Sequence, residues 1–70
     1  MQEIHVRDNF ILHGEGGDDL TVSVVNINYY RPPEAKYAIE IFDQDRNLYG
    51  DDVVFVGDDF FSKDNIERVP

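Results

Sequence analysis

The chain has no cysteine, few basic residues and no long hydrophobic run. Without cysteine, neither a disulfide nor a thiolate zinc site can stabilise the fold, and a reducing compartment is the expected setting. The longest uncharged apolar run is far shorter than the roughly 20 residues of a membrane span. Residues 1–7 lack the basic-then-apolar pattern of a signal peptide. We therefore expect a soluble, cytoplasmic protein with no membrane partner.

Acidic residues outnumber basic ones, since 15 Asp plus Glu against 6 Lys plus Arg give a net charge of −9. Phosphates would be repelled, which argues against direct binding of nucleic acid. Hydrophobic residues (41%) and aromatics (13%) are nevertheless too abundant for a disordered chain. The 70 residues predict a single small domain, 1–70, that buries only about 60% of its unfolded surface. Such a domain needs a well-made sheet, a bound ion or oligomerisation.

No segment shows a convincing helix period, whereas alternation of period two dominates the chain. Ile4 and Val6 alternate with polar neighbours, and an apolar run resumes at residues 10–12. The clearest strand covers residues 20–30, where residues suited to a pleated surface are frequent. Further strands are expected at 36–42, with residues 37, 39 and 41 on one face, and at 53–56, with 48–49 starting the return.

The apolar positions of the 20–30 strand change phase, from even-numbered up to Val24 to odd-numbered from Val25. This predicts a bulge or bend near Val24–Val25, or burial of both faces. No amphipathic helix is available to cover a second face. We therefore expect a mainly β fold, all-β or small α+β, with three to five antiparallel strands. The sheet is either strongly curled or a small barrel, or it is completed by dimerisation.

The C-terminal segment is expected to hold at most one short helical turn. Asp64 followed by Glu67 resembles a capping box, but only six residues follow Asp64. A short edge strand is equally compatible with these residues.

Gly-Asp-Asp occurs at residues 17–19, 50–52 and 57–59, each time before an apolar run. Glycine supplies positive φ in turns and aspartate bonds its own backbone, so turn formation explains most of each triplet. Magnesium chemistry of the polymerase type needs a further acidic strand and a much larger fold. A turn needs only one aspartate, so the second carboxylates, Asp19, Asp52 and Asp59, are left without a structural reason.

One loop matches the start of a calcium site. Asp43, Asp45 and Asn47 occupy the first three alternate ligand positions of an EF-hand loop. The match then fails, because Leu48 stands where glycine is needed and Val54 where a bidentate glutamate is needed. An ordinary hairpin is the favoured interpretation, and a calcium-binding β-module is the weakest alternative function. No other metal and no cofactor are expected.

Catalytic signatures are missing from the sequence. His5 and His13 lack metal-type spacing, and neither Ser23 nor Ser62 has the context of a nucleophile elbow. The glycine-containing segment 14–19 carries acids that would repel phosphate. We therefore expect no enzyme.

The acidic surface is the main functional feature, and its complement is a basic protein surface, most often one that holds nucleic acid. Our hypothesis is a protein–protein interaction module that inhibits such a partner, like the DNA mimics of phages and mobile elements. The alternative is a small homo-oligomeric structural or accessory protein whose acids serve solubility; a halophilic origin would also explain the charge. The expected partner-binding residues are six carboxylates with three aromatic anchors: Asp18, Asp19, Asp51, Asp52, Asp58, Asp59, Tyr29, Tyr30 and Phe60.

Overall fold

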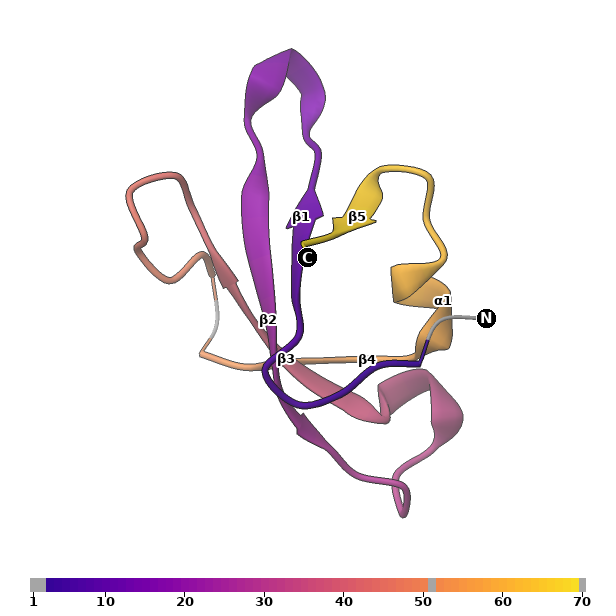
Figure 1. Ribbon diagram of the computed structural model, residues 1–70. Helices are drawn as coiled ribbons and strands as arrows, with labels where there is room; N and C mark the ends of the chain where they lie inside the picture. Colours follow the sequence, from indigo (N-terminus) through magenta and orange to yellow (C-terminus); the bar gives the residue numbers. More distant parts are fainter. Residues whose placement is uncertain (1–2, 51, 70) are drawn as a thin grey trace.

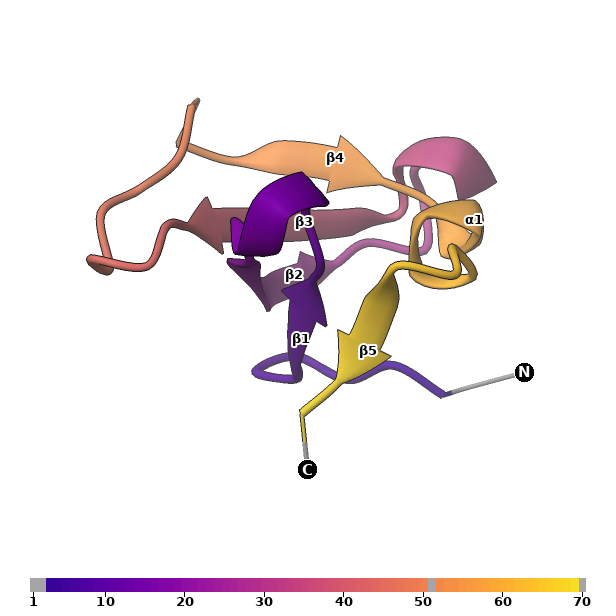
Figure 2. The same ribbon diagram turned by 90° about the horizontal axis from the view of Figure 1, so that it is seen from above.

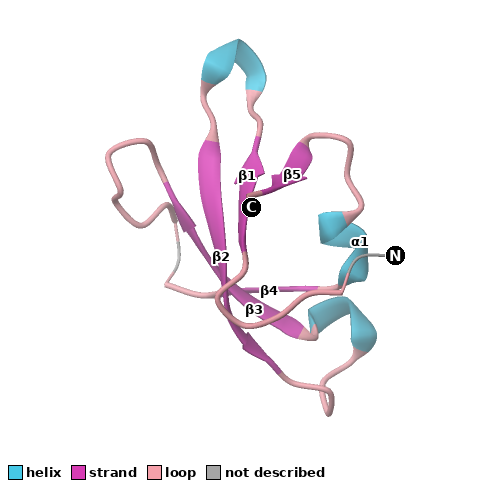
Figure 3. Ribbon diagram, in the orientation of Figure 1, coloured by secondary structure: helices cyan, strands magenta, loops and turns pink. Residues whose placement is uncertain are grey.

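The protein is described by a computed structural model that covers residues 3–50 and 52–69. The fold is mainly β, with five antiparallel strands in one sheet and only short helical turns, as the sequence predicts (Figures 1 and 3). The strands are β1 (Asn9–Leu12), β2 (Leu20–Ile27), β3 (Tyr37–Phe42), β4 (Val54–Val56) and β5 (Ile66–Arg68). The helical turns are η1 (Glu15–Gly17), η2 (Pro33–Ala35) and α1 (Asp58–Phe61).

The sheet order is β4-β3-β2-β1-β5. The first four strands form a meander, and the chain then crosses back so that β5 pairs with the free side of β1. The strand direction turns steadily across the sheet, which is therefore strongly curled but open between β4 and β5 (Figure 1). No helix in the described part of the chain is long and apolar enough to cross a membrane.

A β-bulge in β2 confirms the bulge or bend that the phase change predicts near Val24–Val25. Val24 pairs with Ile39, but the next pair is Asn26 with Ala38, so Val25 is the extra residue. The insertion returns Ile27 to the inner side of the sheet, where it packs with Val22 and Val24.

The core lies on the inner side of the curled sheet. Its buried side chains come from the N-terminal segment and three strands: Ile4, Phe10, Val22, Val24, Tyr37 and Ile39. Phe61 of α1 adds to them, with ring centroids 4.8 Å from Phe10 and 5.1 Å from Tyr37. Figure 2 shows α1 near the end of β4 and the start of β5, where it helps to close the open side of the sheet. Burying one such side chain contributes about 1.5–3 kcal/mol.

Two sequence patterns have a different outcome in the structure. Residues 4–7 alternate with period two but form no strand, because the chain turns at Val6–Arg7, where Arg7 has φ +79°. The capping-box interpretation at Asp64 is wrong, and the edge-strand alternative is confirmed by β5. The helical turn expected in the C-terminal segment lies earlier, at α1, where Phe60 and Phe61 pack against the core.

The outer face of the sheet remains exposed. The side chain of Phe55 is 46% exposed and that of Val25 is 38% exposed. The guanidinium carbon of Arg31 lies 3.8 Å from the centroid of the Phe55 ring. The curl of the sheet thus buries its inner apolar face. No other part of the described chain covers the outer face.

Candidate functional site: an acidic groove between two loops

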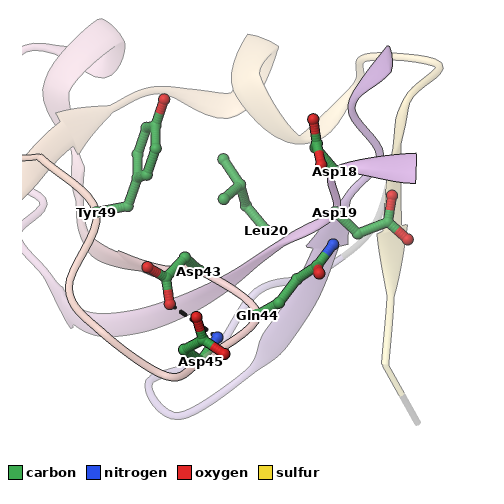
Figure 4. A pocket seen from close by; sticks show the side chains of 7 residues that line it. All are labelled: Asp18, Asp19, Leu20, Asp43, Gln44, Asp45 and Tyr49. Carbon is green, nitrogen blue, oxygen red and sulfur yellow. Dashed lines mark hydrogen bonds between the residues drawn. The ribbon is translucent and has the colours of Figure 1, made fainter. Parts of the chain in front are cut away.

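Two loops meet where β1 and β3 end and β2 and β4 begin. The first joins β1 to β2 through η1, and the second leaves β3 at Asp43. Between them is an open groove of about 350 Å³ (Figure 4). The residues that line it are Asp18, Asp19, Leu20, Asp43, Gln44, Asp45 and Tyr49.

Local backbone geometry brings these loops together. Gly16 and Gly17 have φ +70° and +84°, values that favour glycine, and they reverse the first loop. In the second loop, one carboxylate oxygen of Asp43 accepts hydrogen bonds from the backbone N–H groups of Asp45 and Asn47, both at 2.9 Å. The Gln44 side-chain amide donates to the Gly17 carbonyl at 3.0 Å. The two loops are therefore tied directly to each other.

The groove is negatively charged. Four of its lining residues are aspartates, and no Lys or Arg is among the described residues that line it. His13 lies beside Asp19, with Nδ1 3.4 Å from a carboxylate oxygen, and its Nε2 is 3.0 Å from Glu67. The hydrogen bond to Glu67, followed by the charge of Asp19, raises the pKa of His13. These groups favour the imidazolium form of His13, which places a cation beside Asp19 at the groove.

The groove does not have the geometry of a metal centre. Within residues 3–50 and 52–69, no group of three or more His, Cys, Asp or Glu side chains is placed to hold a metal ion. One oxygen of Asp43 is already used to close the turn that includes Asp45 and Asn47. The calcium hypothesis for these three residues stays a prediction without geometric support.

The structure distributes the sequence-predicted carboxylates over both ends of the sheet. Asp18 and Asp19 line the groove, and Asp52 is exposed in the connection that leads to β4. Asp51 lies outside the described residues. Asp58 and Asp59 lie on α1, which contacts Tyr37 at the opposite end of the β2–β3 pair.

Asp58 has a structural contact. Its carboxylate accepts a hydrogen bond from the Tyr37 hydroxyl at 2.7 Å and lies 3.4 Å from Lys36 Nζ. The Tyr37 hydrogen bond, followed by Lys36, lowers the pKa of Asp58. Asp59, in contrast, is exposed and borders a second hollow with Pro33 and Glu34. The third Gly-Asp-Asp triplet thus holds α1 in place rather than adding to the groove.

The expected aromatic anchors are also away from the groove. Tyr29 and Tyr30 are exposed after the far end of β2, and Phe60 packs against the core. The groove has its own aromatic side chain, Tyr49, which the sequence analysis did not select as an anchor. The antiparallel meander could have indicated that Tyr49 lies near Asp18 and Asp19, because it brings the first and third connections to the same edge of the sheet.

Comparisons of the chain with protein-family models, curated proteins and solved structures find no match. The functional argument therefore depends on the groove, on the charges around it and on the exposed faces of the sheet.

Proposed function

We propose that the chain is a non-enzymatic interaction module that uses its acidic end to bind a basic surface of another protein. The acidic end consists of the exposed or half-exposed carboxylates of the two loops: Glu15, Asp18, Asp19, Asp43, Asp45 and Asp52. The observation that carries the proposal is the groove, where four aspartates from loops distant in sequence face one space.

The groove suits the long side chains of lysine and arginine. Carboxylates accept charge-assisted hydrogen bonds from the cationic head group. Leu20 and Tyr49 offer apolar contact to the methylene stem of the same side chain. The hydrogen bond from Gln44 to Gly17 holds the loops before a partner arrives, so less conformational entropy is lost on binding.

We further propose that the partner surface is one that otherwise holds nucleic acid. Such surfaces are the most strongly basic in proteins and meet rows of phosphates. The acidic end offers several carboxylates on structured loops, and the net charge of −9 steers basic partners towards the chain. In this interpretation the protein inhibits its partner by occupying the phosphate-binding surface.

The test measures binding of the immobilised protein to a panel of purified basic nucleic-acid-binding proteins, with duplex DNA as competitor. The groove variant is Asp18→Asn with Asp45→Asn, and the matched control is Asp59→Asn with Glu34→Gln, which removes the same charge beside the separate hollow at α1. We expect the groove variant to weaken binding by about tenfold or more, since hydrogen-bonded charge pairs carry such energies. We expect the control to change it by less than about twofold.

Salt and competition complete the test. Binding should weaken steeply between low and physiological salt, and duplex DNA should displace the protein from its partner. Equal effects of the two variants would show that only net charge matters. The absence of any salt-sensitive partner in the panel would favour the alternative in which the acids serve solubility.

A further inference from the structure

The outer face of the sheet is partly apolar, and Glu40 is the carboxylate in the two rows of paired residues at its centre. One row across it consists of Asn26, Ala38 and Phe55, which pair across β2, β3 and β4. The next row consists of Asn9, Ser23 and Glu40, which pair across β1, β2 and β3. We propose that this face binds the same face of a second copy of the chain, giving a two-fold symmetric dimer.

The exposed apolar area supports an interface. Besides Phe55 and Val25, Val6 is 48% exposed and lies with Val25 along a shallow hollow over β1 and β2. A folded monomer of 8.1 kDa is expected to expose about 4500 Å². This chain exposes 5124 Å². The whole chain thus exposes more surface than a compact monomer of this mass, which is compatible with a face that is covered in an assembly.

The charges on the outer face identify a second copy as the occupant. Among the described Lys and Arg side chains, those within 4.0 Å of a carboxylate are Lys36 and Arg68. Arg31 instead stacks on Phe55, and Glu40 has no cationic partner within the described chain. One copy thus presents Arg31 and Glu40, neither of them paired with an opposite charge within the described chain, on neighbouring parts of one face. Arg7 adds a second cation to this face, beside Val6 and Val25.

A small hollow next to Arg31 is where Glu40 of the second copy would enter. It holds about 50 Å³ and is lined by Asn26, Asn28, Arg31, Lys36, Ala38 and Phe55. No carboxylate lines it among the described residues, in contrast to the groove and to the hollow beside α1. Arginine and amide donors around such a space suit an incoming carboxylate.

Two-fold symmetry satisfies both charges at once. Glu40 lies two residues along β3 from Ala38, which is about 7 Å. In an isologous interface, Arg31 of each copy meets Glu40 of the other, because each contact occurs twice. The proposal is independent of the acidic groove, which lies at the end of the sheet and remains accessible in the dimer.

The test uses charge reversal followed by mixing. Sedimentation equilibrium of the full chain should show a dimer, and Arg31→Glu or Glu40→Arg alone should raise its dissociation constant by about tenfold or more. Arg31→Glu places an acid opposite Glu40 of the other copy, and Glu40→Arg places a base opposite Arg31 of the other copy, so each variant repels itself. An equal mixture should restore the dimer as a heterodimer, because every pair is then complementary again. The recovery also shows that both variants are folded.

Reversals outside the face serve as controls. Arg46→Glu and Glu15→Arg change the same charges on exposed loop residues and should leave the dissociation constant within about twofold of the unmodified chain. A chain that stays monomeric at millimolar concentration would overturn the proposal, as would single reversals without effect or a mixture that stays monomeric. Added salt should change the dimer little, because it screens the Arg31–Glu40 pairs and also the opposing repulsion of two −9 chains. Salt weakens binding at the groove, so the two proposals can fail separately.

Discussion

The hydroxyl of Tyr37 donates a 2.7 Å hydrogen bond to Asp58, joining the start of β3 to the first residue of α1. The Tyr37 ring also meets Phe61 of the same helical turn edge-on, at 5.1 Å between centroids. A four-residue helix has too few internal hydrogen bonds to form alone. The contact with Tyr37 therefore contributes directly to placing α1 against the core.

Loss of this hydrogen bond should destabilise the fold. Tyr37→Phe keeps the ring and its packing, so we expect the free energy of unfolding to fall by about 1 kcal/mol. Urea denaturation measures the change, and Tyr29→Phe is the matched control, because Tyr29 is an exposed tyrosine for which no side-chain hydrogen bond is found in the described chain. An equal effect of the two substitutions would show that the bond to Asp58 contributes nothing.

Acid should remove the same contribution. The pKa of Asp58 is lowered from its ordinary value of 3.8 in the folded state, so the stabilisation is present above that value. It is lost as the pH falls through the lower folded pKa. The difference in stability between the unmodified chain and Asp58→Asn should therefore be constant near neutral pH and disappear under acid conditions. A difference that persists unchanged at the lowest pH at which the chain still folds would contradict this assignment.

Gly57 and Gly50 should respond differently to substitution, although both open a Gly-Asp-Asp triplet. A Cβ on Gly57 would lie 2.5 Å from the Pro33 carbonyl oxygen and 2.7 Å from the Glu34 Cα. Gly50 has open space but a φ of +79°. Alanine at Gly57 creates a clash that costs about 1–3 kcal/mol, and alanine at Gly50 costs about 1–2 kcal/mol because of its backbone conformation.

Asparagine separates these two causes. Because asparagine tolerates the left-handed region, Gly50→Asn should recover much of the stability lost in Gly50→Ala. Gly57→Asn should be at least as unstable as Gly57→Ala, since the larger side chain meets the same backbone atoms. Thermal denaturation of the four variants measures this, and recovery by asparagine at both positions would mean that the close approach to η2 is not the reason for Gly57.

His13 should make stability depend on pH above 6.5, its ordinary pKa. Its pKa is raised from 6.5, first by the hydrogen bond to Glu67 and then by Asp19, so its contribution is complete below the unfolded value. The contribution is lost as the pH rises through the higher folded pKa. Urea midpoints between pH 5 and 9 should show this decline, and Glu67→Gln should reduce it most. A decline that is unchanged in His13→Gln would assign it to other groups.

Much of the sheet follows from local sequence. Strands β2 and β3 are visible in alternation, and the parity change at Val25 predicts the bulge because an extra residue must return Ile27 to the core. The ends of the chain follow less well, since their conformation depends on distant residues. Residues 66–68 become a strand because β1 offers a free edge, and α1 forms where aromatic side chains reach the core.

The candidate site, like the fold, could be predicted from the sequence only in part. The meander alone places the first and third connections together, so the meeting of Asp18 with Asp43 could be predicted. The hydrogen bond that ties Gln44 to Gly17 could not, because it depends on the exact reach of one side chain. The triplets are identical in sequence, but Asp58 lies within reach of Tyr37 and Asp18 does not. Tertiary contacts therefore decide which aspartates are available to a partner.

Neutralising the groove should stabilise the fold while it weakens partner binding. Asp18 and Asp45 line one space with two further aspartates, so like charges repel across it in the folded chain. We expect Asp18→Asn with Asp45→Asn to raise the free energy of unfolding by about 0.5–1 kcal/mol at low salt. The gain should shrink towards zero at molar salt, where the Debye length is about 3 Å.

The Asp59→Asn with Glu34→Gln control removes the same net charge beside the hollow at α1, so it should gain less stability if proximity within the groove is the cause. Urea denaturation at low and high salt measures both variants. One outcome is a groove variant that is more stable than the unmodified chain and yet binds its partner less tightly. This outcome would show that the groove aspartates destabilise the fold but contribute to binding. A groove variant that is less stable would mean that these aspartates hold the loops together, and its loss of binding would then report on folding.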